Sequence, residues 1–362
     1  MLRFSLFFLF FRFSHQVPVV CYYILDQPPV SEVPVEHCNY VILINSAHIS
    51  EDGQLEVSER DLETFASLRE RRRSAGLLVS ITSTNPSWSF LTSDTDRLNR
   101  FVEDLTANLT KYRLDGVDID WEFPEWSRDA KKGDRQRFGR LLEIIKCRFA
   151  ARKMLLSVAV SGPPTISKVA YDVGALRRYA DMVQIMNYDF HIFNRFSNPF
   201  VGFNAPLHPM RFEVSVLGKM NVESSMKTWL DLGLPKNITF FGIPTYGRAY
   251  QLLTHYIHKP YSPATRSLPA ISSFDDICKF SKNPYYTNVW NHHAQAPYLY
   301  GADGLWISYE NQKSVLAKMA FAKTWAPAGI MVFSIGSDDY RGKCGYGKYP
   351  LITEIAKLAR LW

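Results

Sequence analysis

Short apolar runs recur along the chain and alternate with amphipathic stretches. An unbroken apolar run bounded by polar residues is typical of a strand buried on both faces, as in a parallel sheet. We expect eight such strands, at residues 17–25, 40–45, 77–81, 114–124, 154–160, 182–186, 238–243 and 329–335.

The stretches between these runs carry apolar residues at helical spacing. In 59–74, for example, Leu62, Phe65 and Leu68 fall on one face. Helices are expected at 59–74, 94–112, 133–152, 172–179, 220–232, 311–324 and 351–361.

Strands that alternate with helices predict an α/β fold, and eight of them predict a parallel (β/α)8 (TIM) barrel. One interval, 246–309, is oversized and rich in Tyr, Pro, Ser and His. A loop of that length is uncommon, so a small α+β insertion domain between strands seven and eight is expected there. The barrel would then comprise residues 17–245 and 310–362.

The fourth expected strand carries four carboxylates among apolar neighbours. Asp118, Asp120 and Glu122 alternate with Val117, Ile119 and Trp121, and Asp115 precedes them. Strand alternation turns those three carboxylates to one face. Carboxylates this close cannot all ionise cheaply, so at least one is expected to keep its proton to unusually high pH. A protonated carboxyl beside ionised ones is suited to glycosidic bond cleavage.

The same stretch has a plainer interpretation, as an exposed acidic turn or a cation site. Asp and Glu are poor strand formers, however, and here they alternate with large apolar residues. The polar residues 187–189 and 338–339 also follow expected strands. In (β/α)8 barrels catalytic residues lie at those carboxyl ends, which favours a site there.

Composition narrows the function classes. The 362 residues are 46% hydrophobic and 21% charged, with a net charge of +7. The densest basic cluster, residues 69–73, closes an expected helix, where cations favour the helix dipole. A solvated helix end explains it better than a nucleic-acid site, and no nucleic-acid partner is expected.

The first sixteen residues resemble a secretory signal peptide, with an early Arg followed by Leu and Phe. No later run is long enough for a membrane helix. We therefore expect a secreted, extracellular protein without a membrane partner. Five cysteines fit that expectation if four pair and Cys147 stays free. Sequons at Asn108 and Asn237 are candidate glycosylation sites.

Several motifs, in order, resemble the chitinases and chitinase-like proteins of glycoside hydrolase family 18. LDGVDIDWEFP (114–124) matches that family's DGxDxDWE signature. MNYDFH (186–191) is similar to its MxYDFH, NAPL (204–207) to its NSPL, and GIPTYGR (242–248) to its GxPTYGR. The resemblance extends over most of the chain.

The resemblance implies substrate-assisted hydrolysis of chitin or chitooligosaccharides with retention. Glu122 would protonate the glycosidic oxygen, while the 2-acetamido carbonyl of the sugar attacks the anomeric carbon. Asp120 would orient the acetamide, and Asp118 behind it would adjust the protonation of Asp120. Tyr188 would bind the acetamide oxygen. No metal or organic cofactor is needed, and a monomer is expected.

The resemblance further implies the substrate-binding residues. Asp189 and Arg248 would hold sugar hydroxyls or carbonyls, Met186 would shape the floor, and Phe123 lies just past the acid. The other expected substrate-binding residues are Asp115, Asn187, Phe333, Asn85 and Tyr22. For Tyr22, packing in the core is an equally good alternative. The disulfides implied by the family are Cys21–Cys38 and Cys278–Cys344.

The chain also departs from the family pattern. Where the family has SxGGW after strand three, residues 80–85 read SITSTN, so an aromatic platform on the leaving-group side is lost unless Trp88 replaces it. The Trp of strand eight is Phe333, and the Phe that usually ends strand two is Asn45. The acid is intact while the sugar-stacking surface is reduced.

These departures leave three functions open. The first is an active chitinase, endo- or exo-acting with endo action expected, and the intact acid Glu122 favours activity. The second is a weak or inactive chitinase-like lectin for N-acetylglucosamine-containing glycans, and the third is a hydrolase of other such glycans. The histidines at 255, 258, 292 and 293 lack a matched third ligand and are interpreted as loop residues rather than a metal site.

Overall fold

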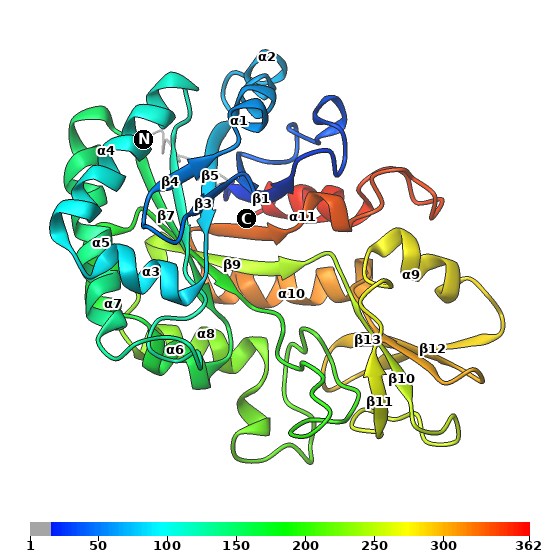
Figure 1. The fold of residues 1–362 in the computed structure, drawn as a ribbon. Helices are drawn as coiled ribbons and strands as arrows, with labels where there is room; N and C mark the ends of the chain where they lie inside the picture. Colours follow the sequence, from blue (N-terminus) through cyan, green and yellow to red (C-terminus); the bar gives the residue numbers. More distant parts are fainter. Residues whose placement is uncertain (1–15) are drawn as a thin grey trace, which may run out of the picture.

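The computed structural model describes residues 16–362, and eight of its strands close into a parallel barrel (Figure 1). In order around the barrel they are β1, β15, β9, β8, β7, β6, β5 and β2. Their bounds are β1 (Val19–Ile24), β2 (Tyr40–Ile44), β5 (Gly76–Thr82), β6 (Gly116–Asp120), β7 (Leu155–Ser161), β8 (Met182–Met186), β9 (Thr239–Pro244) and β15 (Gly329–Phe333). The fold is the (β/α)8 barrel that the sequence predicted.

Each barrel strand is buried on both faces. In β1, Val19, Cys21 and Tyr23 pack outward into the core beneath the helices, whereas Val20 and Tyr22 pack into the barrel interior. These two layers explain why the strands are recognisable as unbroken apolar runs.

Helices cover the outside of the barrel (Figure 1). Their bounds are α1 (Glu59–Ala66), α2 (Leu68–Arg71), α3 (Asn85–Thr92), α4 (Thr95–Lys111), α5 (Asp134–Phe149), α6 (Pro164–Ala170), α7 (Val173–Tyr179), α8 (Val222–Asp231), α10 (Gln312–Trp325) and α11 (Pro350–Ala359). All seven expected helices are present, with boundary shifts. The helix expected at 59–74 is two short helices separated at Ser67, and α3, α6 and a β3 (Ala47–Ile49)–β4 (Leu55–Val57) hairpin were not predicted.

Strand four is shorter than the sequence suggested, because it ends at Asp120. Beyond that point the backbone bonds to side chains instead of a neighbouring strand. The carbonyl of Glu122 accepts from Asn85 Nδ2 at 2.9 Å, and the amide of Phe123 donates to Ser127 Oγ at 2.9 Å.

An antiparallel sheet and one helix occupy the chain between β9 and α10. The sheet order is β11 (Ala264–Ser267), β10 (Arg248–Leu252), β14 (Leu305–Ser308), β13 (Ala296–Gly301) and β12 (Tyr286–Asn291), and the helix is α9 (Phe274–Ser281). They lie to one side of the barrel in Figure 1. These elements make up the α+β insertion.

Two disulfides are formed, Cys21–Cys38 and Cys278–Cys344, the pairs that the family resemblance implied. The second joins α9 of the insertion to the segment before α11, and Cys147 is free and exposed. The expected leader lies outside the described residues apart from Gln16. Within residues 16–362, no helix has the length and apolar character that a membrane crossing requires.

The acidic pair after β15 is structural. Asp338 is fully buried and accepts from the amides of Leu351 (3.0 Å) and Ile352 (2.9 Å) at the start of α11. Asp339 accepts from the amide of Cys344 at 2.6 Å. These carboxylates stabilise the start of the last helix and the loop that carries the second disulfide.

Replacing Asp338 with Ala is expected to destabilise the protein by about 3 kcal/mol, because buried amides lose their acceptor. The urea midpoint of unfolding, followed by circular dichroism, measures this. The control is Asp231→Ala, which removes an exposed i,i+4 pair with Lys227 and should cost less than about 0.5 kcal/mol. Equal midpoints for the two variants would contradict the structural role of Asp338.

Candidate active site

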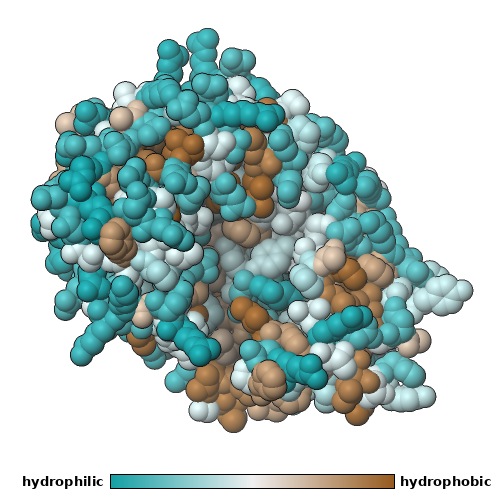
Figure 2. Space-filling view, viewed as in Figure 1, coloured by the Kyte–Doolittle hydropathy of each residue, from teal (hydrophilic) through white to brown (hydrophobic). Residues whose placement is uncertain are grey.

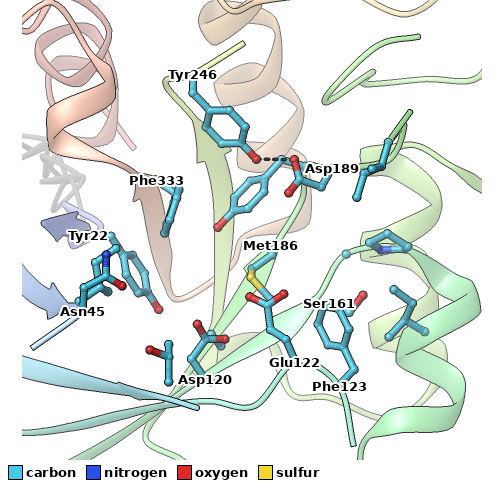
Figure 3. A pocket seen from close by; sticks show the side chains of 18 residues that line it. Tyr22, Asn45, Asp120, Glu122, Phe123, Ser161, Met186, Asp189, Tyr246 and Phe333 are labelled. Atoms are coloured by element: carbon cyan, nitrogen blue, oxygen red, sulfur yellow. Dashed lines mark hydrogen bonds between the residues drawn. The ribbon is translucent and has the colours of Figure 1, made fainter. Parts of the chain in front are cut away.

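A pocket of about 370 Å³ opens at the carboxyl ends of the barrel strands. It is the hollow near the centre of the face shown in Figure 2, and Figure 3 shows its side chains. The pocket is lined by Tyr22, Ile44, Asn45, Thr82, Asp120, Glu122, Phe123, Ala159, Ser161, Gly162, Pro163, Ile166, Met186, Tyr188, Asp189, Ile192, Tyr246 and Phe333.

Two of the three carboxyls belong to β6, where Asp120 lines the pocket and Asp118 lies behind it. Asp118 is fully buried and accepts from Tyr22 Oη at 2.9 Å and Ser80 Oγ at 3.0 Å. Burial raises the pKa of Asp118, although the hydrogen bonds that it accepts act in the opposite direction and lower it. The pKa of Asp120 is raised well above its usual range by burial, then by the charges of Glu122 and Asp118. One oxygen of each aspartate, Oδ1, has no hydrogen-bond partner within the described chain, so each carboxyl has an oxygen that can carry a proton.

Glu122 faces the open part of the pocket. Its side chain is exposed on that side, while protein atoms crowd it on the others. This burial and the negative charge of Asp189 raise its pKa to about 7. Glu122 therefore carries a proton over much of the range in which ordinary glutamates are ionised.

The backbone of Glu122 is held from behind by a buried group. Asn85 Nδ2 donates to the Glu122 carbonyl at 2.9 Å and to Asp129 at 3.0 Å, while its Oδ1 accepts from Trp121 Nε1 at 2.7 Å. Trp121 is stacked on Trp88 with ring centroids 5.3 Å apart, and both indoles are fully buried. Asn85 is thus a positioning residue for Glu122, and Trp88 belongs to the core rather than to the pocket.

Four aromatic rings form a box beside the acids. Phe333 lies 5.5 Å from Tyr22, 5.7 Å from Tyr188 and 6.2 Å from Tyr246, measured between ring centroids. These rings come from β1, β15 and the segments after β8 and β9. They present a half-buried apolar face with phenol groups at its edge, which suits a sugar ring.

Asp189 is fixed by a hydrogen-bond network at the other edge. Its Oδ1 accepts from Tyr246 Oη (2.5 Å), the contact dashed in Figure 3, and from Arg248 Nε (2.8 Å). Arg248 Nε also reaches Asn204 Oδ1 at 3.1 Å. Asp189 adopts φ +59°, a left-handed conformation that Asp tolerates better than most residues. The network holds a negative charge close to Glu122.

A known protein family has this fold and motif order. The family model described as glycosyl hydrolases family 18 matches residues 18–338. The chain belongs to glycosyl hydrolase family 18. An endochitinase of Manduca sexta is 27% identical over 91% of this chain. The chain spans 63% of that relative and 62% of an endochitinase of Brugia malayi, less than two thirds of either.

Two solved structures with the same fold show what that fold can carry. The Group IV chitinase of Ostrinia furnacalis gives a TM-score of 0.88 at 27% identity, covering 95% of this chain and 99% of its own. Human YKL-39, described as a pseudo-chitinase with retained chitooligosaccharide binding, gives 0.85 at 22% identity, covering 94% and 99%. The fold is thus shared with a chitinase and with a pseudo-chitinase, so it does not decide activity.

Eight of the site residues expected from the family 18 resemblance line the pocket. They are Tyr22, Asp120, Glu122, Phe123, Met186, Tyr188, Asp189 and Phe333. Asp118, Asn85 and Arg248 lie behind these residues and contact them or their neighbours.

Two expected residues are not brought to the pocket. Asp115 precedes β6, where it pairs with Arg69 at 2.5 Å and accepts from the amide of Leu77. That end is opposite the carboxyl ends, because Asp120 closes the same strand. Asn187 is fully buried and its Nδ2 contacts Met226 of α8 at 3.4 Å. Both residues have structural contacts in place of the expected contact with substrate.

Residues after β7 were missed by the sequence reasoning. Ser161, Gly162, Pro163 and Ile166 line the pocket, as does Ile192 after β8. The expectation that sites lie at the carboxyl ends of strands would have indicated them, since strand 154–160 was predicted. Within residues 16–362, no group of three His, Cys, Asp or Glu side chains is arranged to hold a metal ion.

Replacing Asp189 with Asn is expected to lower the pKa of Glu122 from about 7, because a nearby negative charge is removed and Arg248 is left uncompensated. A titration of ¹³C-labelled glutamate carboxyls measures this, with the Glu122 resonance identified by its absence in Glu122→Gln. Asp303→Asn, in the insertion, is the control and should leave the titration unchanged. An unaltered or raised pKa in Asp189→Asn would contradict this electrostatic account.

Proposed function

We propose that this protein is a chitinase that hydrolyses β-1,4 linkages between N-acetylglucosamine units, with endo-acting cleavage of chitin or chitooligosaccharides. The observation that carries the proposal is Glu122, whose pKa is raised to about 7 at the edge of an aromatic-walled pocket. A carboxyl protonated near neutral pH is the acid that glycosidic cleavage requires. In support, the Ostrinia furnacalis enzyme is also solved in complex with allosamidin.

The chemistry begins with proton donation. Glu122 gives its proton to the glycosidic oxygen, the C1–oxygen bond breaks, and the leaving sugar departs as an alcohol. The 2-acetamido carbonyl oxygen of the retained sugar bonds to C1 from the other face, which forms an oxazolinium ring. Water then attacks C1, Glu122 takes a proton from that water, and the ring opens to give the product with retained configuration.

Neighbouring groups stabilise the charge that develops. Asp120 accepts from the acetamide N–H as the nitrogen becomes positive, and the proton held with Asp118 keeps this buried pair from repelling itself. Tyr188 donates to the acetamide oxygen, and Phe333 stacks on the sugar face. Met186 shapes the pocket floor, and Asp189 with Arg248 binds neighbouring polar groups.

We further propose that the protein is secreted and acts as a monomer. Two disulfides support an oxidising compartment. Glycosylation is proposed at Asn237, which is exposed, and at Asn108, which is part-exposed in α4.

A chitinase-like lectin is the second candidate, and one observation favours it. Trp88 is fully buried against Trp121, so it does not replace the platform that the chain lacks after strand three. Loss of that platform weakens binding of the leaving group without removing the acid. A lectin would bind chitooligosaccharides and release no products.

Replacing Glu122 with Gln is expected to abolish hydrolysis of N-acetylchitooligosaccharides, by about 10³-fold or more, because both proton transfers are lost. Product release from the tetramer to the hexamer, resolved by chromatography, measures this. Glu125→Gln, three residues further on and exposed, is the matched control and should keep wild-type turnover. Binding without turnover in the wild type would establish the lectin instead.

The pH dependence of kcat/KM is expected to have its alkaline limb near pH 7. Glu122 must be protonated, so the rate is highest below its pKa of about 7 and falls towards tenfold per pH unit above it. Because Glu122 and Asp120 interact, the limb reports the pair. Initial rates on a soluble oligosaccharide between pH 4 and about pH 9 test this. Activity that is still rising at pH 8 would rule out Glu122 as a general acid with this pKa.

A further inference from the structure

The two sides of the pocket differ in chemistry, with Glu122 between them. Figure 3 shows Phe333, Tyr22 and Asn45 on one side of Glu122 and Phe123 on the other. The first side comes from β15, β1, β2 and β5 and includes the polar groups of Tyr22, Asn45 and Thr82. The second side comes from the segments after β6, β7 and β8.

The second side offers almost no hydrogen-bonding groups. Its side chains Phe123, Pro163, Ile166 and Ile192 have neither donor nor acceptor. Ser161 lines it as well, with a buried Oγ that has no hydrogen-bond partner within the described chain. At the edge, Asp189 Oδ1 is occupied by Tyr246 and Arg248, which leaves its Oδ2 for a single polar group. A sugar placed here would exchange water contacts for apolar ones and leave hydroxyls unpaired.

The second side also lacks a flat aromatic platform, and β5, which neighbours β6 in the barrel, supplies none to it. Thr82 is the β5 residue that reaches the pocket, and Trp88 of α3 is stacked inside the core. Phe123 is fixed edge-on against Trp126 and Tyr171, with ring centroids 6.1 and 6.5 Å away. Branched aliphatic side chains and a proline complete the surface, and these contact alkyl or aryl groups better than polyhydroxylated rings.

The second side is where the leaving group lies. The sugar that reacts must place its acetamide at Asp120 and Tyr188 and its ring on Phe333, which fills the first side. Glu122 protonates the oxygen at the edge of that sugar. The group beyond this oxygen therefore extends past Glu122 towards Phe123 (Figure 3). Ile192, in the segment after β8, also lines the pocket.

We infer that the leaving-group side of this pocket binds an apolar group, and that the preferred substrates are β-N-acetylglucosaminides or chitobiosides linked to an apolar aglycone. The inference rests on the proposed function, because that function decides on which side of Glu122 the leaving group lies. It narrows that function, because the scissile bond then joins an amino sugar to an alkyl or aryl alcohol in preference to a further sugar. The reaction balances as before, with the alcohol leaving as the protonated group.

The experiment compares methyl, propyl and butyl β-glycosides of N,N′-diacetylchitobiose with triacetylchitotriose. The alkyl alcohols have similar acidity, so differences in kcat/KM report contacts and not leaving-group chemistry. From methyl to butyl, kcat/KM is expected to rise about tenfold, which allows for incomplete burial at about 0.8 kcal/mol per buried CH₂. The butyl glycoside should also exceed the triose.

Matched variants connect the effect to the wall. Ile192 and Ile257 are exposed to similar extents, 54% and 55%, and only Ile192 lines the pocket. Ile192→Thr should reduce the butyl-to-methyl ratio about threefold, by removing apolar contact and adding a hydroxyl, while Ile257→Thr should leave it unchanged.

Each outcome decides between defined alternatives. Turnover of all substrates with no dependence on alkyl length, or a preference for the triose, would overturn the inference and leave the chitinase proposal standing. If nothing is hydrolysed, the proposed function fails, and calorimetric dissociation constants of the methyl and butyl glycosides test the wall alone. Tighter butyl binding that weakens in Ile192→Thr would then support it, and equal binding would overturn it.

Discussion

The crowding of three carboxyls at the end of one strand is the constraint on which the site depends. Asp118, Asp120 and Glu122 follow one another at alternate positions, so the buried Asp120 lies between the charges of Asp118 and Glu122. In such surroundings the free-energy cost of ionising all three carboxyls exceeds the stabilisation that nearby hydrogen-bond donors provide. The proton that remains is distributed over the group. The burial gradient leaves it available at Glu122, which is open to the pocket, while Asp118 is sealed beneath Tyr22 and Ser80.

The rest of the barrel keeps that crowded group in place. Asn85 binds the carbonyl of Glu122 and the indole of Trp121, and Trp121 is stacked on Trp88. A residue just beyond a strand end has no ladder partner to fix it, so this buried amide replaces the missing strand. Side chains likewise hold Asp189, which lies beyond the end of β8. Tyr246 and Arg248 fix its carboxylate close enough to Glu122 to interact with it electrostatically.

The sequence predicted the barrel better than the site, because apolar runs and motifs carry different information. Unbroken apolar runs record burial on both faces, so the barrel strands and their order were accessible. Motif spacing records the identity of residues but not their depth along a strand. Asp115 and Glu122 belong to one motif, yet Asp115 lies before β6 beside Arg69 and Glu122 lies beyond its other end. The position of Trp88 was equally inaccessible, because nothing local distinguishes an indole stacked in the core from one lining a cleft.

The departures from the family pattern act on different parts of the proposed reaction. Phe333 keeps an aromatic face under the reacting sugar, and its three tyrosine neighbours restrict its orientation. Compared with the Trp of the family, Phe333 therefore offers less stacking area in a similarly fixed orientation. The change after strand three acts elsewhere, because Thr84 stands where the family has Trp and does not line the pocket. In the proposed orientation the segments after β6, β7 and β8 contact the leaving group, and they contribute Phe123, Pro163, Ile166 and Ile192. Glu122 and Phe123 share the segment after β6, whereas Pro163, Ile166 and Ile192 follow β7 and β8. In the proposed reaction the leaving-group surface after β7 and β8 can therefore change while the acid beyond β6 is retained.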